Sequence, residues 1–311
     1  MAQMNNQKIM FNKSLAKSLL IVISAILLVS CATIPPKLLP STIEPSANYL
    51  KKVHPRVVLV LGSGGAKGFS HLGVLKVLER NHVPVDMIVG TSAGSIVGAL
   101  YADQPSADKI EQLLLTAKRE EVIDFSYLNI ASGVVSGVGL QNFLIDHMQA
   151  KTFEQLKIPF IAVATNLESG MPHFFRSGLI APAVNASSAI PPFFRPVNLY
   201  GNTYIDGGFI DPVAVDVAKL FHPKLIIAVE LDNPLSRTLP TFSPSVFIRG
   251  VEIMSMKVER SSARDANVII RPEMGRISLF QETERKDIIA AGERAALKAL
   301  PTIKKLLQEN R

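Results

Sequence analysis

Cysteine and aromatic residues are scarce in this sequence. Its 311 residues include one cysteine, Cys31, no tryptophan and only 6% aromatic residues. A single cysteine allows no intramolecular disulfide, so the fold has to depend on a hydrophobic core. Hydrophobic residues make up 48% of the chain and charged residues 19%, which is typical of a globular protein. No basic cluster interleaved with aromatic residues occurs, and this argues against nucleic acid as a partner.

The N-terminal apolar stretch is too short to favour a membrane-spanning helix. Leu19–Val29 has 11 residues, whereas a spanning helix needs about 20. Three lysines precede it and Ser30-Cys31 follows, which is the pattern of a signal peptide. The tetrapeptide Leu28-Val29-Ser30-Cys31 resembles a bacterial lipobox, in which the cysteine is lipidated. We therefore expect a lipoprotein signal peptide over residues 1–30 and lipidation of Cys31; an ordinary signal peptide is the alternative.

Basic charge is concentrated at the N-terminus. The formal net charge is +7, but residues 1–30 hold three lysines and no acid, so the remainder carries 30 basic and 26 acidic residues.

Residues 31–55 contain five prolines and few core-forming residues, which predicts an extended tether. As a flexible coil, this tether would span about 25–30 Å. That length would let a domain touch or leave the membrane.

From Arg56 onward, short apolar runs alternate with helical patterns. The expected strands, which are nearly continuous in Val, Ile, Leu and Ala, are Val57–Leu61, Met87–Gly90, Pro159–Thr165, Leu225–Leu231 and Val268–Arg271. Helices are expected near 68–80, 93–102, 106–119, 139–149, 212–221, 246–263 and 281–308, the last interrupted by Pro301. This alternation predicts an α/β fold: a three-layer α/β/α sandwich with a largely parallel central sheet, formed by one domain over residues 56–311.

Two stretches fit neither pattern. Asp124–Leu140 and Leu231–Phe247 mix apolar residues with Gly, Ser and Pro. Apolar loops at a surface can act as lids that contact lipid, or they can place their apolar residues in the core. Both interpretations stay open for these two loops.

A glycine-rich loop follows the first expected strand, in the segment VVLVLGSGGAKGFSHLGVL. A Walker loop needs G-x-x-x-x-G-K-[ST], but here Lys67 precedes Gly68. A dinucleotide fingerprint needs G-x-G-x-x-G, and Lys67 stands at the third glycine position after Gly62 and Gly64. Both nucleotide-phosphate motifs are therefore excluded, and a tight turn before a helix is the simplest alternative.

The next expected strand ends in a candidate nucleophile. Gly90-Thr91-Ser92-Ala93-Gly94 is a G-x-S-x-G motif between a strand and a helix, the context of a nucleophile elbow. The glycines are needed because the turn is strained and leaves no room for side chains on either side of the serine. The serine oxygen is then exposed at a helix N-terminus, where the helix dipole favours a developing anion.

Two residues are candidates for the base that accepts the proton of Ser92. His222 fits the chain order of a Ser–acid–His triad, but it stands just before an expected strand and we interpret it as a surface histidine. Asp206 is followed by Gly207 and Gly208, a tight turn that exposes its carboxylate. His71, in the helix after the glycine loop, is expected to pack or to support that loop.

The glycine loop, the elbow serine and the D-G-G turn occur in an order that resembles the patatin-like phospholipase family. The resemblance covers about residues 56–231 and includes the segments GGAKG, GTSAGSIVGALYA, NASSAIPPFFRPV and YIDGGFIDPVAVDVAK. With the lipobox, the chain looks like a bacterial patatin-like lipoprotein. Two departures concern substrate preference more than mechanism: the sequence GSGG, where many members have an aspartate or a third glycine, and Asp211, where many carry asparagine.

The resemblance implies a lipid acyl hydrolase of phospholipase A type, with a dyad of Ser92 and Asp206, no catalytic histidine, no metal and no cofactor. Backbone N–H groups of Gly64, Gly65 and Ala66 would form the oxyanion hole, since no side chain blocks their approach. Lys67 either orients this loop, meets a lipid phosphate or is solvated. The supporting positions are Gly62, Lys67, Gly68, Gly90, Gly94, Gly207 and Gly208.

Two other functions stay open: a membrane-tethered binding or scaffold protein with a hydrolase fold, and an esterase with a Ser-Asp-His triad. The expected partners are a phospholipid or another acyl lipid as substrate, and a membrane reached through the N-terminal lipid. Ala32, rather than aspartate, follows Cys31. By resemblance to bacterial lipoprotein sorting, this places the protein in the cell envelope, at the outer membrane facing the periplasm.

Overall fold

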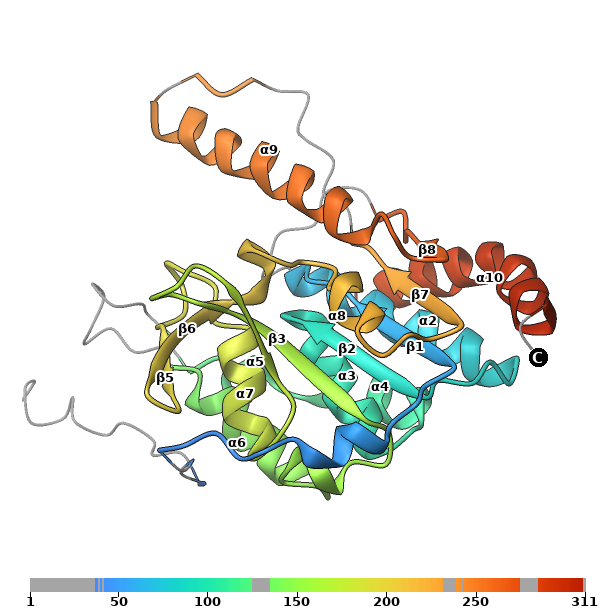
Figure 1. Cartoon of the computed structure of the whole chain (residues 1–311). Coiled ribbons are helices and arrows are strands. Elements are labelled where there is room, and N and C mark those ends of the chain that lie inside the picture. Colours follow the sequence, from blue (N-terminus) through green and yellow to red (C-terminus); the bar gives the residue numbers. More distant parts are fainter. Residues whose placement is uncertain are drawn as a thin grey trace, which may run out of the picture. The chain divides into compact units, whose positions relative to one another are not determined.

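The central sheet has eight strands, of which five are parallel in the order β3-β2-β1-β7-β8. They are β1 (Val57–Leu61), β2 (Met87–Thr91), β3 (Phe160–Asn166), β7 (Leu225–Val229) and β8 (Val268–Ile270) (Figure 1). Every residue of β1, β2 and β7 is buried, which suits their continuous apolar sequences because helices cover both faces of a parallel sheet. The five predicted strands are therefore present, with ends that agree within two residues.

Three short antiparallel strands extend the sheet beyond the parallel strands. They are β4 (Pro172–Phe175), β5 (Val197–Leu199) and β6 (Asn202–Asp206). None is predicted from the sequence, because each has only three to five residues and mixes polar with apolar side chains. β6 matters for the site because its last residue is Asp206.

The helices largely follow the predicted pattern. They are α2 (Phe69–Arg80), α3 (Ala93–Asp103), α4 (Ala107–Thr116), α5 (Arg119–Val122), α6 (Val138–His147), α7 (Ile180–Ser187), α8 (Val215–Lys219), α9 (Ser243–Ala263) and α10 (Arg285–Glu309), with 3-10 turns η1 (Asn48–Lys52), η2 (Gly65–Gly68), η4 (Phe153–Gln155) and η5 (Gly207–Phe209). α7 is not predicted, and α8 is shorter than expected. The predicted interruption at Pro301 is wrong, because α10 continues through this residue to Glu309.

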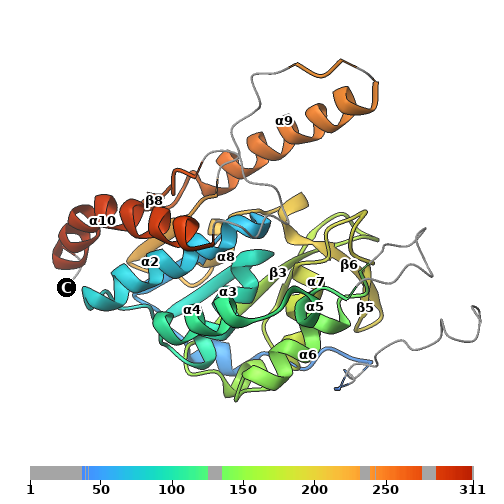
Figure 2. The ribbon, with the colours of Figure 1, turned by 180° about the vertical axis from the view of Figure 1, so that it is seen from behind.

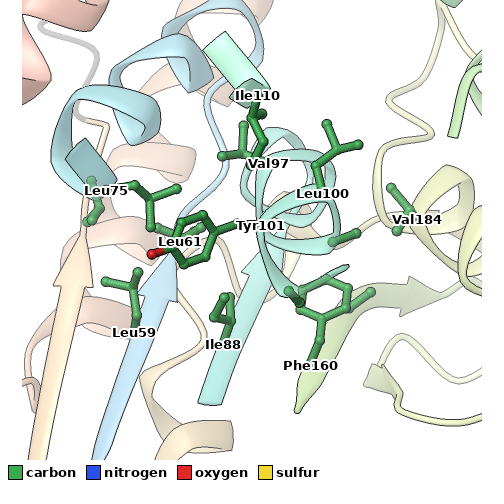
Figure 3. Close-up of a cluster of buried hydrophobic side chains, with 14 of the residues drawn as sticks. Leu59, Leu61, Leu75, Ile88, Val97, Leu100, Tyr101, Ile110, Phe160 and Val184 are labelled. Carbon is green, nitrogen blue, oxygen red and sulfur yellow. The ribbon is translucent and has the colours of Figure 1, made fainter. Parts of the chain in front are cut away.

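Two hydrophobic clusters, one on each face of the sheet, hold the layers together. Successive residues of β1 alternate between them: Leu59 and Leu61 belong to the larger cluster, Val58 and Val60 to the smaller. Residues of α2, α3, α4 and α10 complete the larger cluster, part of which Figure 3 shows, and residues of α8 contribute to the smaller. This arrangement confirms the predicted three-layer sandwich with a largely parallel sheet.

α10 packs closely against α2, the helix that follows the glycine loop. A Cβ on Gly73 of α2 would lie 2.0 Å from Ile289 O, and one on Gly292 of α10 would lie 2.0 Å from Ser70 O. The two backbones therefore touch at a point where only glycine fits. Through this contact the C-terminal helix supports the base of the glycine loop.

The segment before β1 lies against the domain. Lys37 forms an ion pair with Asp146, and Glu44 lies 3.1 Å from Nε2 of His173. Ser177 Oγ donates a hydrogen bond to Pro45 O, and Leu50 is buried in the smaller cluster. These contacts attach the described half of the predicted tether to the domain, so the span of a free coil does not apply to it.

The structure, a computed structural model, describes residues 37–38, 40, 42–124, 135–231, 239–241, 243–274 and 285–309. The predicted signal peptide and Cys31 lie outside these residues, as do most of the two candidate lid loops, 124–140 and 231–247. At the edges of those loops, residues 138–140 belong to α6 and residues 243–247 to α9. No helix in the described ranges combines the length and the hydropathy needed to cross a membrane.

Candidate active site

β2 and β6 meet end to end along one edge of β3. Val163 of β3 pairs with Thr91 at the end of β2, and the next residue, Ala164, pairs with Asp206 at the end of β6. β4 pairs with both Val163 and Ala164, so it occupies the opposite edge. Ser92 follows Thr91 directly, and this register therefore places the elbow serine beside Asp206.

Ser92 occupies a strained turn. Its backbone angles are φ 55° and ψ −122°, in a region that residues with side chains rarely adopt. A Cβ on Gly94 would lie 2.0 Å from Leu61 O, and one on Gly90 would lie 2.6 Å from Gly94 O. The G-x-S-x-G spacing is thus required by the space available around the turn. Ser92 is also the N-cap of α3, so the helix dipole acts on its oxygen.

The side chains of Ser92 and Asp206 are hydrogen-bonded. Ser92 Oγ donates to Asp206 Oδ2 at 2.6 Å, and Gly208 N donates to Asp206 Oδ1 at 2.7 Å. Ser92 is 9% exposed and Asp206 is 2% exposed. Burial raises the pKa of Asp206 from 3.8 to about 6, while the two hydrogen bonds oppose this rise. A carboxylate with a raised pKa is a better proton acceptor near neutral pH.

Three further serines hold the backbone of Ser92. Ser92 N donates to Ser187 Oγ at 3.0 Å, and Ser187 Oγ donates to Val163 O at 2.6 Å. Ser95 Oγ and Ser188 Oγ donate to Ser92 O at 2.7 and 3.2 Å. Ser187 and Ser188 were not predicted as site residues. The signal that could have identified them is their position in the segment NASSAIPPFFRPV, which carries part of the family resemblance.

The glycine loop presents unused backbone donors beside the elbow. Within the described residues, no acceptor is found for the backbone N–H groups of Gly64, Gly65 and Ala66. Gly65 has φ +55°, a conformation that glycine adopts without strain. A Cβ on Gly68 would lie 2.6 Å from the Cβ of Ala93, the residue after Ser92. The loop therefore lies directly against the residue that follows Ser92, and three of its N–H groups have no acceptor among the described residues.

The two ends of this loop are fixed by hydrogen bonds. Gly62 N donates to Val229 O at 3.0 Å, and Ser63 N donates to Pro212 O at 2.8 Å. His71 Nε2 lies 2.9 Å from Gly62 O, and since a carbonyl only accepts, Nε2 carries the proton. Burial lowers the pKa of His71 to about 4, so the ring is neutral at pH 7. His71 thus supports the loop, as expected from its place in the sequence.

Lys67 lies inside the protein. Its side chain is one of the largest that are fully buried, and the residue is 1% exposed. The expectation of a solvated lysine is therefore wrong, and the side chain does not offer its charge at the surface. Of the alternatives considered for it, support of the loop agrees best with this position.

The alternative of a Ser-Asp-His triad lacks a histidine at this site. His222 is exposed and precedes β7, at the amino end of the parallel strands, whereas Ser92 follows the carboxyl end of β2. All six histidines are described, and none is hydrogen-bonded to Ser92 or Asp206. In the described part of the chain, no group of three or more His, Cys, Asp or Glu residues is arranged to hold a metal ion.

A second buried carboxylate lies five residues beyond Asp206. Asp211 Oδ1 accepts a hydrogen bond of 2.5 Å from Ser262 Oγ of α9, and burial raises the pKa of Asp211 to about 6. The backbone O of Asp211 accepts a hydrogen bond of 3.1 Å from Thr91 Oγ1, next to Ser92. Asp211 therefore connects α9 with the elbow, a link that the sequence pattern did not reveal.

Comparison with known proteins gives a consistent set of similarities. The family model described as patatin-like phospholipase matches residues 59–219, which include all three motifs. Patatin-like phospholipase domain-containing protein 6 of Homo sapiens is 33% identical over 198 residues, 61% of this chain and 14% of that protein. An uncharacterised NTE family protein of Mycobacterium bovis is 31% identical over 218 residues, 68% of this chain and 59% of that protein. The chain thus spans less than two thirds of either relative.

Among solved structures, VipD from Legionella pneumophila superposes on 88% of this chain and 72% of its own, with a TM-score of 0.53. The two sequences are 15% identical, so this likeness concerns the fold alone.

Proposed function

Because the chain belongs to the patatin-like phospholipase family, we propose that it hydrolyses acyl esters of lipids, with Ser92 as the nucleophile and Asp206 as its base. The observation that carries this proposal is the 2.6 Å hydrogen bond from Ser92 Oγ to Asp206 Oδ2 within a buried site. No histidine intervenes, so the proton moves directly between the two side chains.

In the first half of the reaction, Ser92 Oγ attacks the ester carbonyl carbon while Asp206 takes the hydroxyl proton. The tetrahedral intermediate collapses to an acyl-serine, and Asp206 gives the proton to the leaving alcohol. In the second half, Asp206 takes a proton from water, the resulting hydroxide attacks the acyl-serine, and the acid is released as Ser92 regains its proton. Asp206 is thus a base and an acid in turn.

Stabilisation of the oxyanion is the larger part of the catalytic effect, because a carboxylate is a weak base for an alcohol. The N–H groups of Gly64, Gly65 and Ala66 have no acceptor among the described residues, which supports their role as oxyanion donors. The loss of one such donor in serine hydrolases costs about 2.7–4 kcal/mol. The hydrogen bond of Ser92 N to Ser187 keeps that N–H group engaged, so Ser92 N itself is not one of the donors.

The cellular setting that we propose is that of a bacterial lipoprotein, held at the outer membrane on its periplasmic side by a lipid on Cys31. The lipobox-like tetrapeptide Leu28-Val29-Ser30-Cys31 and the following Ala32 support this proposal. An anchored enzyme would find phospholipid or another acyl lipid as substrate in the same membrane.

The full chain is to be purified in detergent and assayed with a nitrophenyl ester and with phospholipid. We expect Ser92→Ala and Asp206→Asn each to abolish both activities. Asp216→Asn is the matched control, because this carboxylate on α8 is exposed, whereas Asp206 is buried. Full activity of Ser92→Ala would refute the serine mechanism. Loss of activity in His222→Ala, with activity kept in Asp206→Asn, would show a histidine triad instead.

A further inference from the structure

α9 differs from the other helices in that its described contacts with the sandwich lie in its C-terminal half. In both views the helix projects beyond the sandwich (Figures 1 and 2). Val258, Ser261 and Ser262, near its end, line a pocket together with residues of α8 and the loop after η5, and Ala263 is fully buried. Toward the other end, Val246, Ile253 and Met254 are 54%, 49% and 68% exposed. The exposed apolar residues therefore lie on the projecting half.

The exposed apolar residues Val246, Ile253 and Met254 of α9 and the exposed bases Lys257 and Arg260 form one stripe with two chemical halves. Positions 246, 253, 257 and 260 share a face at helical spacing, with Met254 beside them. Val246, Ile253 and Met254 make the outer half apolar, whereas Lys257 and Arg260, both exposed, make the inner half basic. Asp265 pairs with Lys219 at 2.6 Å and with Arg264 at 3.5 Å, so this carboxylate is engaged beyond the end of the stripe.

The stripe is connected to the candidate active site. β7 ends beside the glycine loop, and a Cβ on Gly64 would lie 2.8 Å from the side chain of Leu231. From this edge of the sheet the chain continues to α9, whose Ser262 is bonded to Asp211 in the loop after Asp206. Phe209 and Ile210, in the same loop, are 47% and 39% exposed. Apolar side chains thus reach the surface on α9 and next to the catalytic turn.

We propose that α9 is an interfacial helix that docks the protein on a bilayer containing anionic phospholipid, with Val246, Ile253 and Met254 among the acyl chains and Lys257 and Arg260 at the phosphates. The helix would insert with its projecting end first, because its apolar half is the outer one. Lys257 follows Ile253 by one helical turn, about 6 Å of rise along the axis, and this rise separates the bases from the apolar residues in depth. This docking stands on the surface of α9 and does not require that the protein hydrolyse lipid.

A second copy of the chain fits the stripe less well than a bilayer does. Antiparallel pairing of two copies around Ile253 would place Val246 against Arg260, an apolar residue against a charge. Parallel pairing would place Lys257 and Arg260 against the same bases of the other copy. A bilayer surface, in contrast, offers acyl chains and phosphates at the two depths that the stripe requires.

The test uses a local fluorescent label on the full chain. Cys31→Ser leaves no thiol, so Gly250→Cys carries a polarity-sensitive dye, since this position is exposed on the stripe side of α9 and a Cβ there would meet no atom within 4 Å; Lys298→Cys on α10 is the control site. Ser92→Ala is included so that lipid stays intact. Vesicles of phosphatidylcholine are compared with vesicles that also contain phosphatidylglycerol. The N-terminal apolar segment is the same throughout, so differences between the two labelled sites report on α9.

We expect the dye at position 250 to shift to shorter wavelength with the anionic vesicles and the dye at position 298 to stay unchanged. Lys257→Gln and Arg260→Gln should each weaken this response about fivefold, since a base near an anionic surface contributes about 1 kcal/mol. Ile253→Ser with Met254→Ser should remove it, and Lys305→Gln on α10 should not affect it. Equal responses at both sites or to both vesicle types would overturn the proposal. So would a shift without vesicles that grows with protein concentration, which would indicate a second copy.

Discussion

Ser92 and Asp206 are 114 residues apart in the sequence, yet they share a hydrogen bond of 2.6 Å because their strands end one residue apart on the same edge of β3. Thr91 pairs with Val163 and Asp206 pairs with Ala164. The nucleophile and the base are therefore positioned by the sheet rather than by a flexible loop. Both side chains are buried.

Activity should fall below pH 6. The proposed base acts as a carboxylate, and burial raises the pKa of Asp206 to about 6, so its protonation removes the base as the pH falls through this value. We expect kcat/KM for a soluble ester to drop about tenfold for each pH unit below 6. Asp211 has a similar pKa, so Asp211→Asn is the necessary control. A midpoint near 4, or one that Asp211→Asn moves, would contradict this assignment.

Asp206→Asn should stabilise the fold at pH 8. Because the folded-state pKa of Asp206 is raised, burial of the charged form destabilises the protein above pH 6, and this cost disappears as the pH falls below it. A rise from 3.8 to about 6 corresponds to about 3 kcal/mol at most. Urea unfolding at pH 8 and pH 4 should show a gain that is large at pH 8 and small at pH 4.

Asp265→Asn is a control in which the pKa shift has the opposite sign. The hydrogen bond and ion pair with Lys219 lower the pKa of Asp265. This variant should show no gain in stability at pH 8. An equal gain in both variants would mean that the effect of Asp206→Asn does not come from burial of its charge.

His71→Leu should reduce kcat for ester hydrolysis with little change in KM. The substitution removes the 2.9 Å hydrogen bond to Gly62 O and loosens the loop that carries the proposed oxyanion donors. The loss should reach about 100-fold if one donor is effectively lost. Since burial lowers the pKa of His71 to about 4, the acid limb near pH 6 should keep its position in the variant. If the acid side of the pH–activity profile shifted in His71→Leu, the titrating group would be His71 rather than Asp206.

Ser187→Ala should reduce both stability and activity. It removes the acceptor of Ser92 N, and a buried donor without a partner costs about 1–3 kcal/mol. Ser188→Ala is the matched comparison, because Ser95 still donates to Ser92 O at 2.7 Å when Ser188 is gone. Thermal unfolding and kcat should both be affected more by Ser187→Ala. The reverse order would show that Ser188 is the main support of the elbow.

Cys31→Ser should release the protein from the membrane fraction if Cys31 carries the lipid. In cells of a bacterial host, the unchanged chain should require detergent for extraction, and the variant should not. Mass spectrometry of the extracted protein would show the lipid directly. An unlipidated Cys31 in the membrane fraction would favour an ordinary signal peptide or another mode of attachment.

The parallel strands could be predicted because each is a short, continuous run of apolar residues, as in VVLVL of β1 and LIIAV of β7. β4, β5 and β6 could not, because each is short and mixes polar with apolar residues, and because β6 is held by its pairing with β3, which is distant in the sequence. α10 was expected to break at Pro301, but its buried face, with Gly292 against α2 before Pro301 and the buried Ile303 after it, holds the helix on both sides.

The sequence by itself determined the α/β class and the three motifs, because apolar periodicity and glycine spacing are local properties of the chain. It singled out Ser92 and Asp206 individually but not their distance. Their contact, the support of Ser92 by Ser187, the burial of Lys67 and the link from Asp211 to α9 were decided by the tertiary structure. The physical reason is that each depends on strand register and on packing between distant segments, and neither leaves a periodic signal in the sequence.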